Sequence, residues 1–225
     1  MLLSEAIALT QKIVRDNAAK LSDTQDEAGI EAPYESGLAL ALSTYSMRVP
    51  LRKTQTINCG ANGMILTSAI TGFDEGFISY LQVEHPVAVS GPPNWMTPDA
   101  YILDILDTGQ VIRFVDAIPN TGDPCRIVHH VPHVAPNDDS APFTVRGSDM
   151  NAVCHLAGAN CLRMLSTYYG QTTNKPRITT DGSLSVFQTL SAEYTKLAAV
   201  EQGIYDAHMT IAYGGAAIGY RAVRG

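Results

Sequence analysis

Three histidines, His129, His130 and His133, form the densest group of metal-ligating side chains in the sequence. The stretch that holds them, CRIVHHVPH, is rich in β-branched residues and predicts a strand. Alternate side chains of a strand share a face, so His129 and His133 would lie on one face about 13 Å apart, too far to hold one zinc ion. We therefore expect a structural role; the alternative is a metal site completed by Asp138, Asp139 or a second subunit.

Asp107 opens the triplet Asp-Thr-Gly. In aspartic-type proteases two such aspartates share a proton across a dyad and activate a water molecule. Here the triplet separates two strand-like runs, YILDIL and QVIRF, and Asp and Gly are both common turn residues. A hairpin turn is the simpler interpretation. Proteolysis that uses Asp107 is the enzyme hypothesis that competes with it.

The remaining reactive residues lack the surroundings that catalysis needs. Cysteines stand at positions 59, 125, 154 and 161 without a C-x-x-C pair, which indicates buried free thiols and folding in a reducing cytoplasm. No G-x-S-x-G elbow, Walker loop or G-x-G-x-x-G motif is present. We therefore expect a protein that is not an enzyme and that requires no metal and no cofactor.

Helices are predicted at both ends of the sequence. The first would be capped by Ser4 and run to about Lys20, and the second would begin at Pro33 and end near Tyr45. A third covers residues 148–169, where Ala157, Gly158 and Ala159 mark a point of close helix approach. A fourth covers residues 185–206. Its predicted buried stripe consists of Leu190, Tyr194, Leu197 and Ile204.

The centre of the sequence reads instead as β structure. Short apolar runs bounded by Gly, Pro, Asn and Asp predict an antiparallel meander or a small sandwich. The runs are LRKTQTINC, MILTSAI, FISYLQVEHPVAV, YILDIL, QVIRFVDAIP and CRIVHHVPH. The fold class is thus α+β, with a helical bundle, a central β-rich insert and an extended C-terminal arm. The expected divisions are 1–50 (N-terminal helices), 51–147 (β-rich insert), 148–207 (a helix pair that packs with 1–50) and 208–225 (arm).

Two regions are candidates for contacts with other molecules. Trp95, in the loop GPPNWMTP, could be an exposed anchor or could fold onto its own core. The segment from 208 has no acidic residue, and its glycines disfavour a regular helix. We expect it to pack on a neighbouring subunit; disorder is the alternative. Its candidate contact residues are Ile211, Tyr213, Ile218, Tyr220, Arg221 and Arg224.

Composition and charge point to assembly. Charged residues make up 16% of the 225 residues and apolar residues 45%, so part of the apolar surface is expected to be buried against other subunits. A net charge of -7 argues against a protein that wraps nucleic acid, although it leaves room for DNA that passes nearby. No run of 18 apolar residues occurs, and the first residues lack the basic start of a signal peptide, so no membrane partner is expected.

The order of these elements resembles the head–tail adaptor (connector) proteins of tailed bacteriophages. Two short helices lead to the pattern A...Y..R.P, a β-rich insert follows, and then come helices of the types D..AV..LA...CLR.L..YY and Y..LA. The matching residues are Ala41, Tyr45, Arg48 and Pro50; Asp149, Ala152, Val153, Leu156, Ala157, Cys161, Leu162, Arg163, Leu165, Tyr168 and Tyr169; and Tyr194, Leu197 and Ala198.

The resemblance implies a structural protein of the virion neck. Such proteins form a homo-oligomeric ring, commonly of twelve copies, that docks beneath the portal protein and offers a platform to the next neck or tail protein. DNA would pass through the channel without sequence-specific contacts, and the C-terminal arm would thread into the portal or an adjacent subunit. The alternative within the same class is another virion component, such as a tail-completion or head-decoration protein.

Overall fold

The computed structural model describes residues 1–15, 33–74, 77, 81–107, 109–172 and 183–214. The chain divides into a helical unit, formed by the described residues up to 49 and from 133 onward, and a β unit, formed by those from 50 to 132. The fold class is α+β, as the sequence predicts. None of the described helices is both long and apolar enough to cross a bilayer.

Four helices lie in the described part of the helical unit: α1 (Leu3–Val14), α3 (Pro33–Arg48), α4 (Gly147–Thr172) and α5 (Ser183–Tyr213). Pro33 occupies the first position of α3, where its missing N–H costs nothing. The sequence predicts all four helices, but Ser4 is not a cap: α1 begins at Leu3, and the Ser4 amide donates to Asp139 Oδ1 at 2.9 Å.

The ends of two helices also differ from the prediction. Helix α1 stops at Val14 because Arg15 adopts a left-handed conformation (φ 52°), while the rest of the range predicted up to Lys20 lies outside the described residues. Helix α5 continues through residues 208–213, which the sequence assigns to an extended arm. The first residue that breaks it is Gly214, at φ +67°, so the residues before it keep their helical hydrogen bonds.

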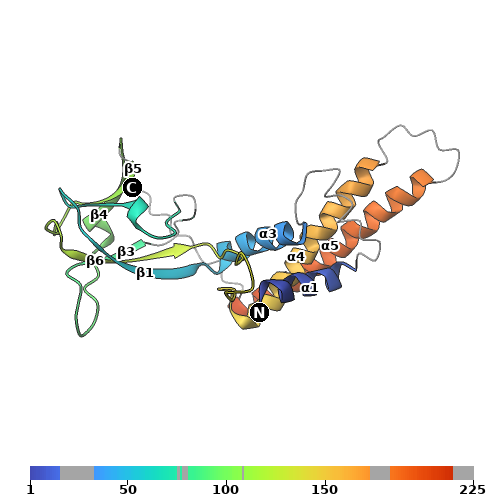
Figure 1. The fold of residues 1–225 in the computed structure, drawn as a ribbon, viewed down its shortest axis with the longest axis horizontal. Coiled ribbons are helices and arrows are strands. Elements are labelled where there is room, and N and C mark those ends of the chain that lie inside the picture. The colour runs from blue at the N-terminus through green and yellow to red at the C-terminus, as the bar shows by residue number, and fades with distance from the viewer. Residues whose placement is uncertain (16–32, 75–76, 78–80, 108, 173–182, 215–225) are drawn as a thin grey trace. The chain divides into compact units, whose positions relative to one another are not determined.

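Helix α4 is the centre of the helical unit, because α1, α3 and α5 all pack against it (Figure 1). Val153, Ala157, Cys161 and Leu165, which lie along one face of α4, are buried. The close approach predicted near Ala157 is confirmed on two sides. A Cβ atom added at Gly158 would stand 2.6 Å from Ile13 Cγ2 of α1, and one added at Gly37 of α3 would stand 2.6 Å from Cys161 Sγ.

The β unit contains two three-stranded antiparallel sheets. The first has the order β1 (Leu51–Asn58), β6 (Pro124–Val131), β3 (Leu81–Glu84), and the second has the order β2 (Met64–Leu66), β5 (Gly109–Phe114), β4 (Tyr101–Leu106). Each strand overlaps one of the six predicted runs, although β5 and β6 begin one residue earlier, at Gly109 and Pro124. Both sheets contribute to one apolar cluster, in which Ile65 and Ile112 of the second sheet join Val83 and Ile127 of the first.

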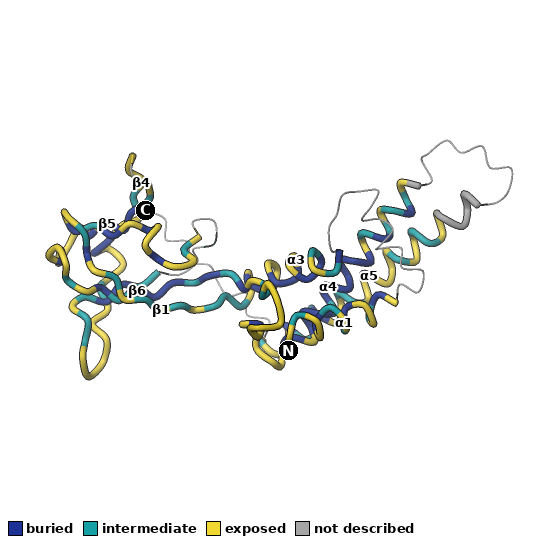
Figure 2. Tube along the Cα trace, in the orientation of Figure 1, coloured by how far each residue is buried: buried dark blue, intermediate teal, exposed yellow. Residues whose placement is uncertain are grey.

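Residues 133–146, at the end of the predicted β-rich segment, contain no described helix or strand. Pro132 follows β6, and Pro136 and Pro142 interrupt the stretch, which disfavours further ladder pairing. Phe143 and Val145 are buried in the same cluster as Leu38 and Ala157, so this stretch packs with the helices (Figure 2).

Candidate assembly surface

Helix α5 carries two apolar faces. Ala198, Tyr205 and Met209 are almost fully buried against the rest of the helical unit. A second set stands in solvent, and its exposed fractions are Leu197 48%, Val200 58%, Ile204 42% and Ile211 86%. At about 100° per residue these four side chains fall within one quarter of the helix circumference, well away from the buried face. We call them the α5 stripe.

The position of Leu197 and Ile204 corrects the sequence prediction, which placed both in the buried stripe of this helix. The spacing of apolar residues along α5 fits two ridges, and the ridge through Ala198, Tyr205 and Met209 is the one that faces the core. Periodicity alone finds apolar ridges but does not say which of two ridges has a partner inside the same chain. The sequence does contain the second ridge, since Leu197, Val200, Ile204 and Ile211 recur at helical spacing, but this spacing does not show which ridge faces the core.

Polar contacts attach the buried side of α5 to α4 and α3, so the helix that carries the α5 stripe has a fixed orientation in the helical unit. His155 Nδ1 of α4 lies 2.6 Å from Glu201 Oε2, and both side chains are mostly buried. Arg48 of α3 pairs with Asp206 at 3.0 Å, and its guanidinium stands over the Tyr205 ring at 5.5 Å. These contacts join three helices. By resisting rotation of α5 about its axis, they keep the α5 stripe at the surface.

The C-terminal turn of α5 is anchored by the buried carboxylate of Asp149, in the first turn of α4. The side chains that donate to this carboxylate are Tyr45, Ser148, His208 and Tyr213. Burial by itself raises the pKa of Asp149, but these hydrogen bonds outweigh burial and lower the pKa to about 2. The group is therefore a charged anchor at neutral pH, and it ties α3, α4 and α5 together.

Helix α3 contributes a smaller apolar ridge to the surface of the same unit. Leu40 and Met47 are 53% and 54% exposed, and their seven-residue spacing places them on one side of α3. The opposite side of α3 is buried through Leu38, Ala41 and Tyr45. The helical unit therefore presents two separate apolar ridges, one on α5 and one on α3.

Three of the residues predicted from sequence as contact residues are described. Ile211 belongs to the α5 stripe and is the most exposed member. Tyr213 is half-buried, and its hydroxyl donates to Asp149, so it anchors α5 rather than standing free. Trp95 is 37% exposed and pairs through its backbone with Glu84 beside β3. The others, at positions 218, 220, 221 and 224, lie outside the described residues.

The histidines do not assemble a site. His129 lies in the β unit and His133 in the helical unit. His133 Nε2 donates to the Val49 carbonyl at 2.9 Å, and its Nδ1 lies 2.8 Å from Thr144 Oγ1. Burial lowers the pKa of all three histidines. Asp138 and Asp139 accept from the Ser140 and Ser4 amides, and the described residues hold no group of three or more potential metal ligands.

Asp107 and the cysteines are as the residue patterns predict. Leu106 pairs with Gly109, so Asp107 is exposed in a hairpin turn between β4 and β5. Cys59, Cys125, Cys154 and Cys161 are all buried and free. Burial raises the pKa of each thiol, which disfavours the thiolate that a nucleophile requires.

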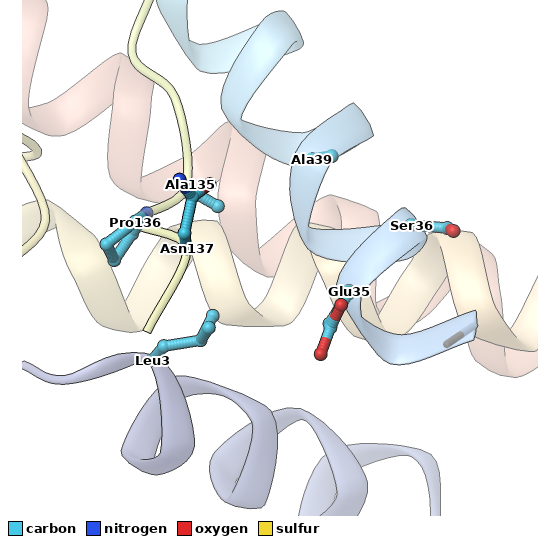
Figure 3. Close-up of a pocket in the computed structure, with 7 residues that line it drawn as sticks. All are labelled: Leu3, Glu35, Ser36, Ala39, Ala135, Pro136 and Asn137. Carbon is cyan, nitrogen blue, oxygen red and sulfur yellow. The ribbon is translucent and has the colours of Figure 1, made fainter. Parts of the chain in front are cut away.

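A hollow of about 370 Å³ opens on the helical unit between α1, α3 and residues 135–137 (Figure 3). Its lining is Leu3, Glu35, Ser36, Ala39, Ala135, Pro136 and Asn137. Glu35 is the one ionisable side chain among these residues, so the lining offers no second group for acid–base chemistry.

Comparison with known proteins adds no assignment. No protein-family model matches the chain, and no curated protein matches it at a significant level. Function must therefore be inferred from the surfaces and contacts described above.

Proposed function

We propose that this chain is a structural subunit of the neck of a tailed bacteriophage, a head–tail adaptor that forms a ring beneath the portal and joins capsid to tail. The single observation that carries the proposal is the α5 stripe. Four large apolar side chains stand in water on a helix whose other face already packs inside the chain. A monomer gains nothing from that arrangement, whereas an oligomer buries it.

The two ridges of the helical unit suit a cyclic assembly. In a closed ring each subunit uses one surface toward the neighbour ahead and a different surface toward the neighbour behind. The α5 stripe can fill the first role and the α3 ridge of Leu40 and Met47 the second. Complete burial of one Leu, Ile or Val side chain contributes roughly 1.5–3 kcal/mol. Most side chains of the two ridges are about half exposed, so an intersubunit contact could add about half of that free energy for each.

The residues that carry the resemblance to adaptor proteins support the same proposal. Tyr45 donates to Asp149 at 2.7 Å, which joins the first pattern to the second. Arg48 reaches α5 through Asp206. Ala41 and Ala157 are fully buried where α3 meets α4. The quoted residues therefore maintain the packing of the helical unit, which is the part that would form the wall of a ring.

The charge balance fits a channel that DNA traverses. A net charge of -7 gives the chain little capacity to neutralise phosphates, so DNA would slide rather than bind. In this proposal the partners are further copies of the chain, the portal protein and the next neck or tail protein, and the place of action is the virion neck. No bound cofactor has a role in it.

The test is the oligomeric state of variants in the α5 stripe. Ile204→Glu places a charge in the stripe, and Ala199→Glu places the same charge on an exposed position of α5 outside it. We expect the unmodified chain and Ala199→Glu to form rings in mass photometry and electron microscopy. Ile204→Glu should remain a 24.1 kDa protomer with an unchanged melting temperature.

Purified portal particles complete the test, because an adaptor ring should bind them and a tail-completion or decoration protein should not. An unmodified chain that stays monomeric both alone and with portal particles would sink the adaptor proposal. Rings that form without any affinity for the portal would instead favour another virion component.

A further inference from the structure

Strand β4 is an edge strand with an apolar, uncovered surface on both faces. It pairs only with β5 in its sheet, so one side of its backbone has no strand beside it among the described residues. The exposed fractions of its side chains are Ile102 39%, Leu103 40%, Ile105 76% and Leu106 36%. Because neighbouring positions point to opposite faces, this exposure covers both sides of the strand.

The other three edges of the β unit are protected in ways that β4 is not. Strand β2 has three residues and β3 has four, and the edge of β3 is met by the backbone at Trp95. Strand β1 is long, but Arg52, Thr54, Thr56 and Asn58 are its exposed residues. Short length, cover and charge are the usual protections of a sheet edge. The charge on β4, Asp104, is paired with Arg113 of β5 at 3.1 Å.

We infer that β4 is the docking edge for residues 216–225 of this chain, AAIGYRAVRG, which would add as a further strand of the sheet. The segment lies outside the described residues, and its sequence supplies the complementary chemistry. It is apolar, contains no acid and no proline, and carries Arg221 and Arg224. Extended segments bind sheet edges through their backbone, with side chains providing selectivity.

Charge decides between this occupant and a second copy of β4. Asp99 and Asp107 are exposed at the two ends of β4. Two β4 strands paired antiparallel would bring these acidic ends together. Residues 216–225 contain no acid and would instead place Arg221 and Arg224, which are three residues apart, near one of the two ends. The inference does not require a ring, since the segment could come from the same chain or from a neighbouring copy.

Disulfide capture in the full-length chain tests the inference. Ile105→Cys would be combined with Ala222→Cys in one variant and with Val223→Cys in another. Adjacent positions of a strand point to opposite faces of the sheet, so one of the two new cysteines should lie on the same face as residue 105. The native thiols are buried and do not compete. The matched control places the first cysteine at Thr56, an exposed position on the edge of β1.

We expect one of the two β4 pairs to form a disulfide about tenfold faster than its β1 control, because docking raises the effective concentration of the thiols. Migration as a monomer or as a dimer on a non-reducing gel would identify the source of the segment. The charge reversals Arg221→Glu and Arg224→Glu should together remove this advantage.

Hydrogen exchange gives an independent readout that needs no cysteine. The β4 amides that point away from β5 should exchange about tenfold faster in the charge-reversed variant than in the unmodified chain. Equal rates of disulfide formation at β4 and β1, together with β4 amide exchange rates that the charge reversal does not change, would overturn the inference. That result would leave the ring proposal untouched, since the α5 stripe is tested by different variants.

Discussion

Gly37 should be among the least replaceable residues of the helical unit. It lies within α3 and is buried, and a Cβ atom there would stand 2.6 Å from Cys161 Sγ and 3.1 Å from the Ala157 carbonyl oxygen of α4. Helix propensity alone favours Gly→Ala by about 1 kcal/mol. The steric overlap works in the opposite direction, and overpacking of this kind costs about 1–3 kcal/mol. We expect Gly37→Ala to destabilise the protein by up to about 2 kcal/mol once the propensity gain of about 1 kcal/mol is subtracted.

Gly203 provides the matched control, because it lies within α5 and no atom from outside its own turn of the helix lies within 4 Å of the position where a Cβ would stand. Gly203→Ala should therefore stabilise by up to about 1 kcal/mol. Urea unfolding followed by the helical circular dichroism signal would measure both changes. In the double variant Gly37→Ala with Cys161→Ala, the new methyl group occupies space left by the sulfur. The coupling energy of that cycle should be favourable by at least about 1 kcal/mol.

The opposite sign at Gly37 would refute the reasoning. If Gly37→Ala stabilised the helical unit as much as Gly203→Ala does, then α3 and α4 could not be as close as described. A coupling energy near zero would show that the destabilisation has another origin than the contact with Cys161.

Three further predictions concern charge and the end of α5. Asp149→Asn should lower the free energy of unfolding at pH 7 by about 2 kcal/mol. The lowered pKa of Asp149 stabilises the fold only while the carboxyl is ionised, so the unmodified chain loses this stability as the pH falls from about 3.8 towards 2, and the variant should not show that loss. An unchanged acid unfolding profile would contradict this. Both ring nitrogens of His129 are buried without a well-formed hydrogen bond to the described residues. The Thr71 backbone raises the pKa of His129, but burial outweighs that effect and lowers the pKa overall. His129→Leu should therefore stabilise the β unit by about 1–2 kcal/mol and flatten its loss of stability below pH 6.5, as read by chemical unfolding at pH 5 and 7; a destabilised variant would show that the imidazole has a partner. Deletion from residue 208 should lower the melting temperature of the helical unit more than deletion from 215 does, because Met209 is buried and His208 contacts Asp149. Equal effects of the two deletions on the helical unit would argue against the anchor.

Much of the architecture could be predicted because it depends on local signals. Pro33 and Pro50 delimit α3, and the turn residues around YILDIL and QVIRF locate the hairpin of β4 and β5. Small residues in α4 predicted the close approach at Gly158. These features follow from backbone preferences that act over a few residues.

Features that depend on tertiary contacts could not be predicted in the same way. The choice of which α5 ridge faces the core depends on contacts with α4 and α3, so the sequence alone places Leu197 and Ile204 on the wrong side. The carboxylate of Asp149 gathers donors from residues 45, 148, 208 and 213, whose separation along the chain hides them from any local pattern. The helical end of α5 followed from these contacts rather than from propensity.

Labelling of the four buried thiols can report unfolding of the chain without an added probe. Cys59 and Cys125 lie in the β unit, and Cys154 and Cys161 lie in α4 of the helical unit. A thiol reagent can modify them only after the surrounding packing opens, so labelling followed by peptide mass analysis records the opening rate of each unit separately in one sample. The same measurement on assembled particles would show which unit an intersubunit contact holds closed.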